Sequence, residues 1–296
     1  MPSPKVAEML VAIAVGLMAA GCAASERADR TDEANRPQVP MTFRVDTREG
    51  AFDCDFYLPT QGKPAPLVVV AYGFSRSKSN MADWGCRLSQ EGLAVAVPTL
   101  PAWSDHVRNG RAILELVDWI GASDDLKASV DNKRVGLVGF SAGGLATLLA
   151  AADSPDVGVW VGLDPVDMGS QGVRAATRLK CPSLVLRAEP HACNANGNAA
   201  EICRVLGAEN TSLLVIGAVH VDAEWPTDVL AELVCGKSSS ERREVFARYT
   251  VAALRAALLA DRESAAALSR ASNDPAVKVL TPVRKMVSTG PHPTQL

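Results

Sequence analysis

The stretch Arg134-Val-Gly-Leu-Val-Gly-Phe-Ser-Ala-Gly-Gly144 decides the fold of this 296-residue chain. Residues 139–143 match the pattern G-x-S-x-G, in which a serine occupies a sharp turn between a buried strand and a helix. Apolar residues precede the motif at Val135–Val138, and an Ala/Leu-rich stretch follows at Leu145–Ala152. The N-terminal amides of such a helix face developing negative charge. The pattern therefore predicts Ser141 as a nucleophile, with a glycine-rich turn without chemistry as the alternative.

Strand-like and helix-like segments alternate around this stretch. Short, almost wholly apolar runs predict strands buried on both faces at Leu67–Ala71, Leu93–Val97, Val135–Val138, Val157–Leu163, Ser183–Arg187 and Ser212–Ile216. Helical patterns lie at about 79–91, 106–122, 142–152, 199–207, 226–235 and 239–260. This alternation predicts an α/β fold with a mainly parallel central sheet and helices on both faces. An antiparallel lead-in is expected from Met41–Val45 and Phe52–Tyr57.

Both ends of the chain differ in composition from its middle. Lys5 and the apolar run Met9–Ala20, which is shorter than the ~20 residues of a membrane span, predict an export signal. Cys22 follows small residues as in a lipoprotein cleavage site, so we expect it to be lipidated, with a plain secretory signal as the alternative. The protein is thus expected to be exported, either anchored to the cell envelope or secreted. The expected organisation is a signal over 1–22, a flexible linker over 23–40, a folded domain over 41–262 and a partly irregular extension over 263–296.

Charge and cysteine content narrow the class of protein. The formal net charge is −3 and no block of Lys and Arg is present, which argues against a nucleic-acid partner. In an exported chain, the six cysteines other than Cys22 predict disulfides. Cys193 and Cys203 are close enough in sequence to staple one loop, while buried free thiols are the alternative. No Cys or His spacing fits a zinc site, so neither a metal nor a cofactor is expected.

A histidine is the expected general base. In folds built on this motif the chain order is serine, acid, histidine, and His220 follows the last apolar run after the short turn at 217–219. His106 precedes the serine and is expected to start a surface helix, and His191 lies in an earlier loop. His292 belongs to the irregular tail. His220 is therefore the predicted base.

The acid is less clearly marked. Asp164 follows the run Val157–Leu163 directly, and Pro165 fixes the exit of the chain from that strand tip. Glu189 lies in the loop after Ser183–Arg187, where an acid is more commonly found, and Asp167 is a third candidate. A carboxylate at a strand tip is well placed to orient an imidazole. We favour Asp164, with Glu189 as the alternative acid.

Backbone amides and apolar side chains complete the expected site. The amide of Ala142, next to the serine, is one expected donor to an oxyanion, and the amide of Phe74, after the first apolar strand, is the other. Phe74, Phe140 and Trp103 are candidates for binding the apolar part of a substrate. Ordinary core packing is the alternative for Phe140 and Trp103.

Several motifs together resemble the chlorophyllase-like branch of the α/β-hydrolases, with dienelactone-hydrolase-like polyester hydrolases and cutinases as more distant relatives. The resemblance spans about 41–235 and rests on Gly73-Phe-Ser-Arg-Ser77, Gly139-Phe-Ser-Ala-Gly-Gly144, Leu163-Asp-Pro-Val-Asp167, Cys193-Asn-Ala-Asn-Gly-Asn198 and Val219-His-Val-Asp222. It implies a triad of Ser141, Asp164 and His220. Two departures are the missing glycine before His220 and the small Ala142 in place of a larger residue.

The resemblance implies hydrolysis of carboxylic esters through an acyl-enzyme intermediate, without implying chlorophyll as the substrate. The expected substrate is a small or lipophilic ester, and a lipidated Cys22 places the enzyme at a membrane surface. Two alternatives remain open. One is a thioesterase or peptidase that uses the same triad, and the other is a non-catalytic envelope binding protein on a hydrolase scaffold.

Overall fold

The structure is a computed structural model that describes residues 39–60, 64–207 and 210–281. The expected signal segment, the lipidation candidate Cys22, nearly all of the expected linker and His292 lie outside the described residues.

A nine-stranded sheet forms the centre of the domain, in the order β1-β2-β4-β3-β5-β6-β7-β8-β9. The strands from β4 to β8 in this order run parallel, whereas β1, β2 and β9 are antiparallel to their neighbours. This arrangement confirms the predicted mainly parallel sheet and its antiparallel lead-in. The strands are β1 (Met41–Thr47), β2 (Gly50–Tyr57), β3 (Ala65–Ala71), β4 (Ala94–Pro98), β5 (Val130–Phe140), β6 (Val157–Leu163), β7 (Ser183–Arg187), β8 (Asn210–Val215) and β9 (Val277–Thr281).

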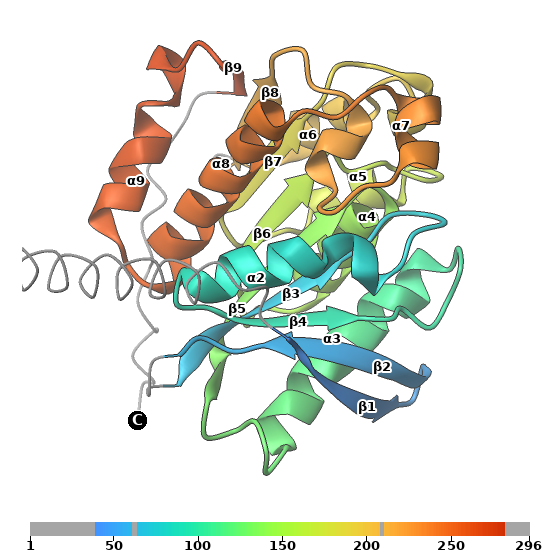
Figure 1. Cartoon of the computed structure of the whole chain (residues 1–296), viewed down its shortest axis with the longest axis vertical. Helices are drawn as coiled ribbons and strands as arrows, with labels where there is room; N and C mark the ends of the chain where they lie inside the picture. Colours follow the sequence, from blue (N-terminus) through green and yellow to red (C-terminus); the bar gives the residue numbers. More distant parts are fainter. Residues whose placement is uncertain (1–38, 61–63, 208–209, 282–296) are drawn as a thin grey trace, which may run out of the picture. The chain divides into compact units, whose positions relative to one another are not determined.

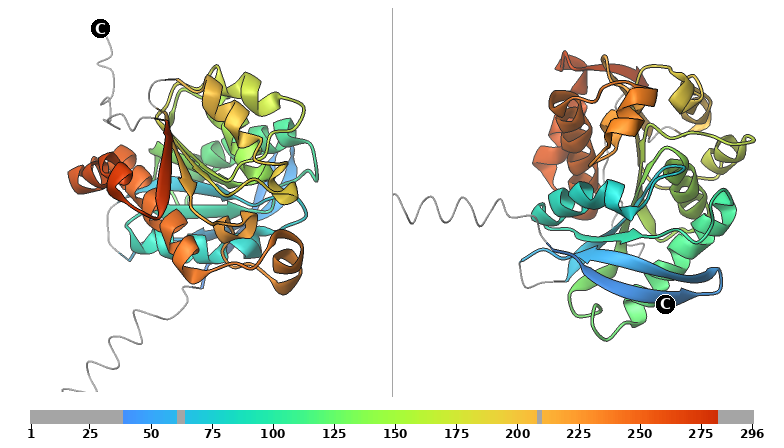
Figure 2. Two further views of the ribbon diagram at one scale, coloured as in Figure 1. Left: turned by 90° about the horizontal axis from the view of Figure 1, so that it is seen from above. Right: turned by 45° about the vertical axis from the view of Figure 1, so that its right-hand side comes forward.

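Helices cover both faces of the sheet (Figures 1 and 2). They are α2 (Ala82–Gln90), α3 (His106–Ala122), α4 (Ala142–Asp153), α5 (Gln171–Ala176), α6 (Ala199–Val205), α7 (Val229–Cys235), α8 (Ser240–Leu258) and α9 (Arg262–Ser269). Short 3-10 turns lie at η1 (Lys78–Met81), η2 (Ala192–Asn194), η3 (His220–Ala223) and η4 (Ala271–Asn273). Polar side chains start several helices; the Asp105 carboxylate, for example, accepts a hydrogen bond from the amide of Arg108 at the start of α3.

Alternate residues of each central strand face opposite cores. In β3, Val68 and Val70 pack with side chains of α2 and α8, whereas Leu67 and Val69 pack with those of α3 and α4. Because side chains on a strand alternate between its two faces, an unbroken apolar run fills both cores at once. The buried strands hold the site loops at the carboxyl end of the sheet.

The extension at the carboxyl end, expected to be partly irregular, contains regular elements in its described part. Within 263–281, most of α9, the turn η4 and strand β9 are regular structure. Strand β9 pairs with β8 through Leu214 and Lys278, among other residues, so the sheet extends beyond the predicted domain boundary at residue 262. The run Val277–Thr281 is short and half-exposed, and its partner strand lies some sixty residues earlier, so no local pattern marks it.

The disulfide also differs from the expected loop staple. Cys193 is bonded to Cys235, 42 residues away, and not to Cys203. Cys203 is buried in α6, where its Sγ accepts a hydrogen bond from the hydroxyl of Ser212. The bond therefore joins η2 to the end of α7, two elements that are distant in sequence and adjacent in the fold.

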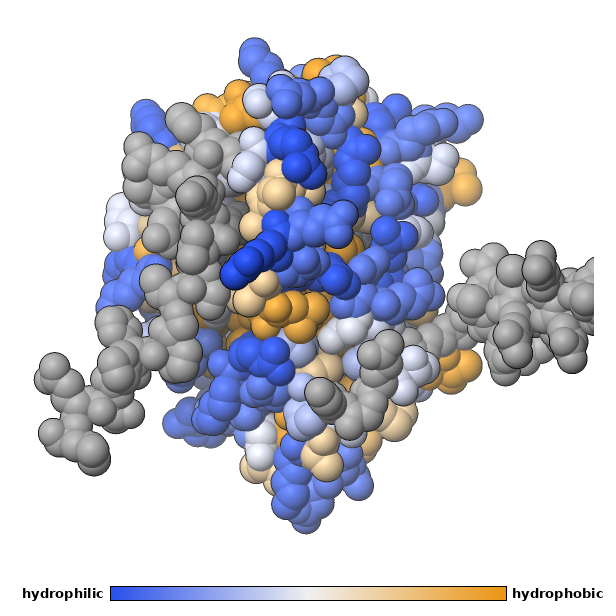
Figure 3. Space-filling view, turned by 90° about the vertical axis from the view of Figure 1, so that its left-hand side faces the viewer, coloured by the Kyte–Doolittle hydropathy of each residue, from blue (hydrophilic) through white to orange (hydrophobic). Residues whose placement is uncertain are grey.

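The helices in the described part of the chain do not meet the requirements of a membrane span. None of the helices there combines the length and the apolar character that crossing a bilayer requires. In the same residues, no group of His, Cys, Asp and Glu is arranged to hold a metal ion. Hydrophilic side chains predominate on the face shown in Figure 3.

Candidate active site

Ser141 sits in a strained turn between β5 and α4. Its φ and ψ angles are 54° and −121°, a region that non-glycine residues rarely occupy. The turn depends on glycines: a Cβ at Gly143 would lie 2.3 Å from the carbonyl oxygen of Tyr72, and one at Gly139 would lie 2.3 Å from that of Gly143. Strand β3, strand β5 and helix α4 therefore pack too closely for any other residue at these two positions.

The backbone of Ser141 is also tied to the neighbouring strand. Its amide donates to the carbonyl of Leu163 at 3.1 Å, and its carbonyl accepts from the amide of Val166 at 3.1 Å. The tip of β6 and the turn after β5 thus form one rigid unit, and Asp164 lies inside that unit.

His220 connects Ser141 to Asp164. Its Nδ1 lies 2.6 Å from Asp164 Oδ2, and its Nε2 lies 2.9 Å from Ser141 Oγ. Because a carboxylate can only accept, Nδ1 carries the proton and Nε2 is left to accept from the serine hydroxyl. The imidazole is buried, and the ring of Phe140 packs against it at a centroid distance of 4.7 Å.

Asp164 is fully buried, with 0% of its surface exposed. Besides His220, it accepts hydrogen bonds from the amide of Ala188 at 3.0 Å and from Nδ2 of Asn194 at 2.9 Å. These bonds offset the cost of burying a charge. Its φ angle is 44°, so a second residue of the site is held in the left-handed region.

Two backbone amides near Ser141 have no protein acceptor. Within the described residues, neither the amide of Phe74 nor that of Ala142 donates to a protein acceptor. Ala142 is the first residue of α4, where amides have no partner inside the helix. Phe74 and Ala142 line the same cavity. These are the two amides that the sequence predicts as donors to an oxyanion.

A comparison with known protein families identifies the family of this chain. The family described as PET hydrolase-like matches residues 29–227, which is more than half of the chain. The chain belongs to this family. Membership confirms the α/β-hydrolase fold and the polyester-hydrolase-related branch that the motifs indicated.

Two relatives of this PET hydrolase-like chain are named. The chain is 29% identical over 136 residues to the bis(hydroxyethyl) terephthalate hydrolase of Streptomyces coelicolor, covering 45% of this chain and 43% of the relative. It is 22% identical over 136 residues to Cutinase 2 of Thermobifida cellulosilytica, covering 45% and 50%. The match spans about half the length of each relative or less.

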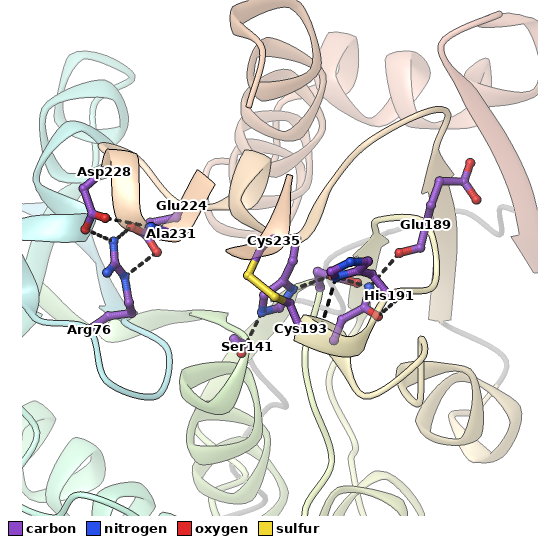
Figure 4. The surroundings of a disulfide bond; sticks show 12 residues. Arg76, Ser141, Glu189, His191, Cys193, Glu224, Asp228, Ala231 and Cys235 are labelled. Carbon is purple, nitrogen blue, oxygen red and sulfur yellow. Dashed lines mark hydrogen bonds and ion pairs between the residues drawn. A yellow bond between two sulfur atoms is a disulfide. The ribbon is translucent and has the colours of Figure 1, made fainter. Parts of the chain in front are cut away.

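The other two candidate acids of this PET hydrolase-like chain lie elsewhere. Glu189 is exposed, its Oε1 accepts from the amide of Gly217 at 3.3 Å, and its carboxylate points away from Ser141 (Figure 4). Asp167 accepts hydrogen bonds from the amides of Gly172 and Val173 and so holds the start of α5. The carboxylate that bonds His220 is that of Asp164.

The candidate substrate-binding side chains divide into two groups. Phe74 and Trp103 are exposed, line the cavity and stack edge to face at a centroid distance of 5.1 Å. Phe140 differs from its expected role, because it is buried beneath His220 and does not line the cavity. Its side chain belongs to the core on the face of the sheet that α2 and α8 cover.

Two other histidines of the described chain, His106 and His191, lie outside the hydrogen-bonded chain of Ser141, His220 and Asp164. His106 starts α3 as predicted, but it is buried in the cavity wall and not at the surface. Burial lowers the pKa of its imidazole, with the nearby Asp105 acting weakly in the opposite direction. His191 accepts a hydrogen bond from the amide of Cys193 at 3.3 Å.

A buried ion pair that no sequence pattern predicts lies beside the cavity. Arg76 Nε donates to Glu224 Oε2 at 2.8 Å, and its Nη2 also bonds Glu224 and, at 2.7 Å, Asp228. Glu224 is fully buried, and this burial raises its pKa while Arg76 acts against the rise. Arg76 belongs to one of the quoted motifs, but its partner lies 148 residues later and no local pattern marks that partner.

Helix α7 lies next to the site with its apolar side outward. Its four large apolar side chains, Val229, Leu230, Leu233 and Val234, are all exposed. The helix is held by Asp228, whose carboxylate accepts from the amide of Ala231 and from Arg76, and by the disulfide at Cys235 (Figure 4). Polar and covalent links, rather than apolar packing, therefore fix its position.

Proposed function

We propose that this protein hydrolyses carboxylic esters, with Ser141 as nucleophile, His220 as general base and Asp164 as the acid that orients His220. The observation that carries the proposal is the unbroken chain of hydrogen bonds from Ser141 Oγ through the imidazole to a buried carboxylate. A serine hydroxyl is a weak nucleophile unless a positioned base accepts its proton. Family membership supports the same chemistry.

In the first half of the reaction, Ser141 Oγ attacks the ester carbonyl carbon while His220 Nε2 takes the hydroxyl proton. The carbonyl oxygen becomes an oxyanion that accepts hydrogen bonds from the amides of Phe74 and Ala142. The buried carboxylate of Asp164 stabilises the imidazolium. When the tetrahedral intermediate collapses, the bond to the alcohol oxygen breaks and His220 gives that oxygen its proton.

In the second half, water replaces the alcohol. His220 takes a proton from the water as its oxygen attacks the acyl carbon of the ester on Ser141. Collapse of the second intermediate releases the carboxylic acid and returns the proton to Ser141 Oγ. The chain's own residues supply every proton transfer.

An ester with an apolar or aromatic acyl part fits the cavity best. The exposed pair of Phe74 and Trp103 offers aromatic faces and edges at the cavity wall. The relative from Streptomyces is named for a terephthalate ester, whose ring matches such a wall. Bis(hydroxyethyl) terephthalate is therefore the first substrate to test.

We also propose that the protein is exported and that Cys22 is its lipid attachment residue. The apolar run Met9–Ala20 and the small residues before Cys22 support this placement. Mass spectrometry of the protein expressed in a bacterium tests it. A lipid-modified N-terminal Cys22 that Cys22→Ser abolishes is expected, whereas an unmodified N-terminus elsewhere contradicts the proposal.

Purified protein tests the activity directly. We expect turnover of p-nitrophenyl butyrate and bis(hydroxyethyl) terephthalate, and covalent labelling by a fluorophosphonate probe. Ser141→Ala should abolish both, with circular dichroism showing an unchanged fold. Turnover that survives Ser141→Ala contradicts the proposed nucleophile.

A matched pair of substitutions tests the acid. Asp164→Asn should lower kcat by about 10⁴-fold, because an amide leaves the imidazole in the wrong tautomer. Glu189→Gln should leave kcat unchanged, since the Glu189 carboxylate is exposed and bonds only a backbone amide. The reverse pattern contradicts the role of Asp164.

A further inference from the structure

We propose that Asn194 is a positioning residue of this site, which fixes the carboxylate of Asp164 for His220. The inference rests on the proposed function. Asn194 Nδ2 lies 2.9 Å from Asp164 Oδ2, the same oxygen that lies 2.6 Å from His220 Nδ1. Asn194 therefore acts on the imidazole through the acid, without touching the reacting atoms.

The orientation of the Asn194 amide is fixed by its surroundings. Its Oδ1 accepts hydrogen bonds from the amides of His191 at 2.8 Å and Gly197 at 2.9 Å. Its Nδ2 donates to Asp164 and to the carbonyl oxygen of Glu189 at 2.9 Å. Two donors face one end of the group and two acceptors face the other, so a flipped amide would lose all of these bonds. The donor must point at Asp164.

No water can easily replace this donor. Asn194 is 1% exposed and Asp164 is 0% exposed. A buried carboxylate oxygen that loses a hydrogen bond pays the full cost of its desolvation. The Asp164 side chain would then be expected to rotate about its Cβ–Cγ bond, and the direction in which it accepts from His220 would change with it.

The loop that carries Asn194 is itself anchored. The neighbouring residue Cys193 is bonded to Cys235 of α7, and Asn194 closes η2 through its bonds to His191 and Gly197. The loop after β7 is where the acid of this fold is commonly found, and here it supplies an amide to an acid from β6 instead. The loop thus contributes a hydrogen-bond donor to the site, whereas the acid comes from the end of β6.

Two substitutions separate the donor from the loop. Asn194→Asp has nearly the same shape and keeps an acceptor for the amides of His191 and Gly197, but it sets an oxygen 2.9 Å from Asp164 Oδ2. Asn194→Ala removes both functions. The two variants therefore distinguish loss of the hydrogen bond to Asp164 from loss of the loop structure.

The other charged groups near His220 are already paired. Asp222, on the same turn, bonds Arg242, and Glu224, just after the turn, bonds Arg76. Asp164 is the carboxylate that bonds the imidazole. At 2.9 Å the carboxylates at 164 and 194 ionise one after the other, and once both are ionised the extra negative charge favours the protonated imidazole, so the acid limb of the rate profile should move to higher pH in Asn194→Asp.

The matched control is Asn198→Ala. Asn198 lies in the same loop and exchanges two hydrogen bonds with the backbone of Asp167, but none with Asp164. Hydrolysis of p-nitrophenyl butyrate should be measured from pH 5 to 9 for each variant, together with the melting temperature and fluorophosphonate labelling of Ser141.

We expect kcat to fall about 10- to 100-fold in Asn194→Asp, the range that corresponds to losing one hydrogen bond to a charged group. KM should stay near its original value, and the acid limb should shift to higher pH. Asn198→Ala should keep the original kcat and profile at a comparable melting temperature. An Asn194→Asp variant with unchanged kcat and profile overturns the inference. If the unmodified protein lacks Ser141-dependent turnover, the proposed function fails instead.

Discussion

Arg76, in the loop after β3, forms a two-point ion pair with Glu224, which directly follows the turn that carries His220. The pair joins the loop that carries Phe74 to the turn that carries His220. Its carboxylate is fully buried, whereas the guanidinium is 18% exposed at its side chain. Two parts of the site that are about 150 residues apart in sequence are thus held at a fixed distance.

Glu224→Gln should weaken both stability and activity. The substitution leaves Arg76 with one carboxylate partner, Asp228, and we expect a loss of about 1.5–3 kcal/mol in the free energy of unfolding, the range for a hydrogen bond to a charged group. The value of kcat should fall because the loop of Phe74 loses its link to the histidine turn. Urea denaturation and ester hydrolysis measure the two effects. Asp228→Asn is the control on the same guanidinium and should cause a smaller loss, since Asp228 is exposed. Equal losses in both variants contradict the expected role of the buried pair.

Gly143→Ala should disrupt the turn at Ser141. A Cβ there would lie 2.3 Å from the carbonyl oxygen of Tyr72, which is backbone and cannot move aside easily. We expect a destabilisation of about 1–3 kcal/mol and a large loss of kcat. Gly158→Ala is the matched control, because its nearest atoms lie at 3.3 and 3.4 Å. Chemical denaturation of the two variants checks the expectation, and similar stabilities would contradict it.

His106 should make the protein sensitive to mild acid. Burial lowers the pKa of its imidazole in the folded state, so below about pH 6.5, the ordinary value, the unfolded chain binds the proton first. Stability is therefore lost as the pH falls from that value toward the lowered one. Between pH 7.5 and 5.5, the free energy of unfolding should fall further in the unmodified protein than in His106→Gln. Parallel curves for the two proteins would show that His106 does not contribute.

Removal of the disulfide should destabilise the protein. Cys193 and Cys235 are 42 positions apart in the sequence, and losing such a link costs about 2–4 kcal/mol. The double substitution Cys193→Ser and Cys235→Ser should lower the melting temperature, and a reductant should lower that of the unmodified protein to the same value. The reductant should have no further effect on the double variant. A melting temperature that does not respond to either change contradicts the expected contribution.

Local patterns in the sequence predict only part of the fold. The apolar run before Ser141 and the Ala/Leu-rich run after it predict β5 and α4, because a strand buried on both faces and a buried helix each have a characteristic composition. No local pattern predicts strand β9, because the strand is held by its pairing with β8, a segment far away in the chain. The pairing of Cys193 with Cys235 depends on the same kind of contact.

Within the site, chain order and strand tips led to three candidate residues that the structure brings within hydrogen-bond distance. Three asparagines, Asn194, Asn196 and Asn198, follow one another at alternate positions of one loop. Only the fold distinguishes the one that reaches Asp164. The alternation of side chains along β5 determines on which face of the sheet Phe140 lies. It does not determine which elements pack over that face.

The directions of the two outer strands determine where a carrier linked to either end of the described chain would lie. Strand β1 runs from Met41 toward the end of the sheet where Ser141 lies, and β9 runs from Val277 away from that end to Thr281. The described chain therefore enters and leaves facing away from the cavity. Immobilising the domain on a bead or a carrier through either end would leave the cavity accessible from the solution.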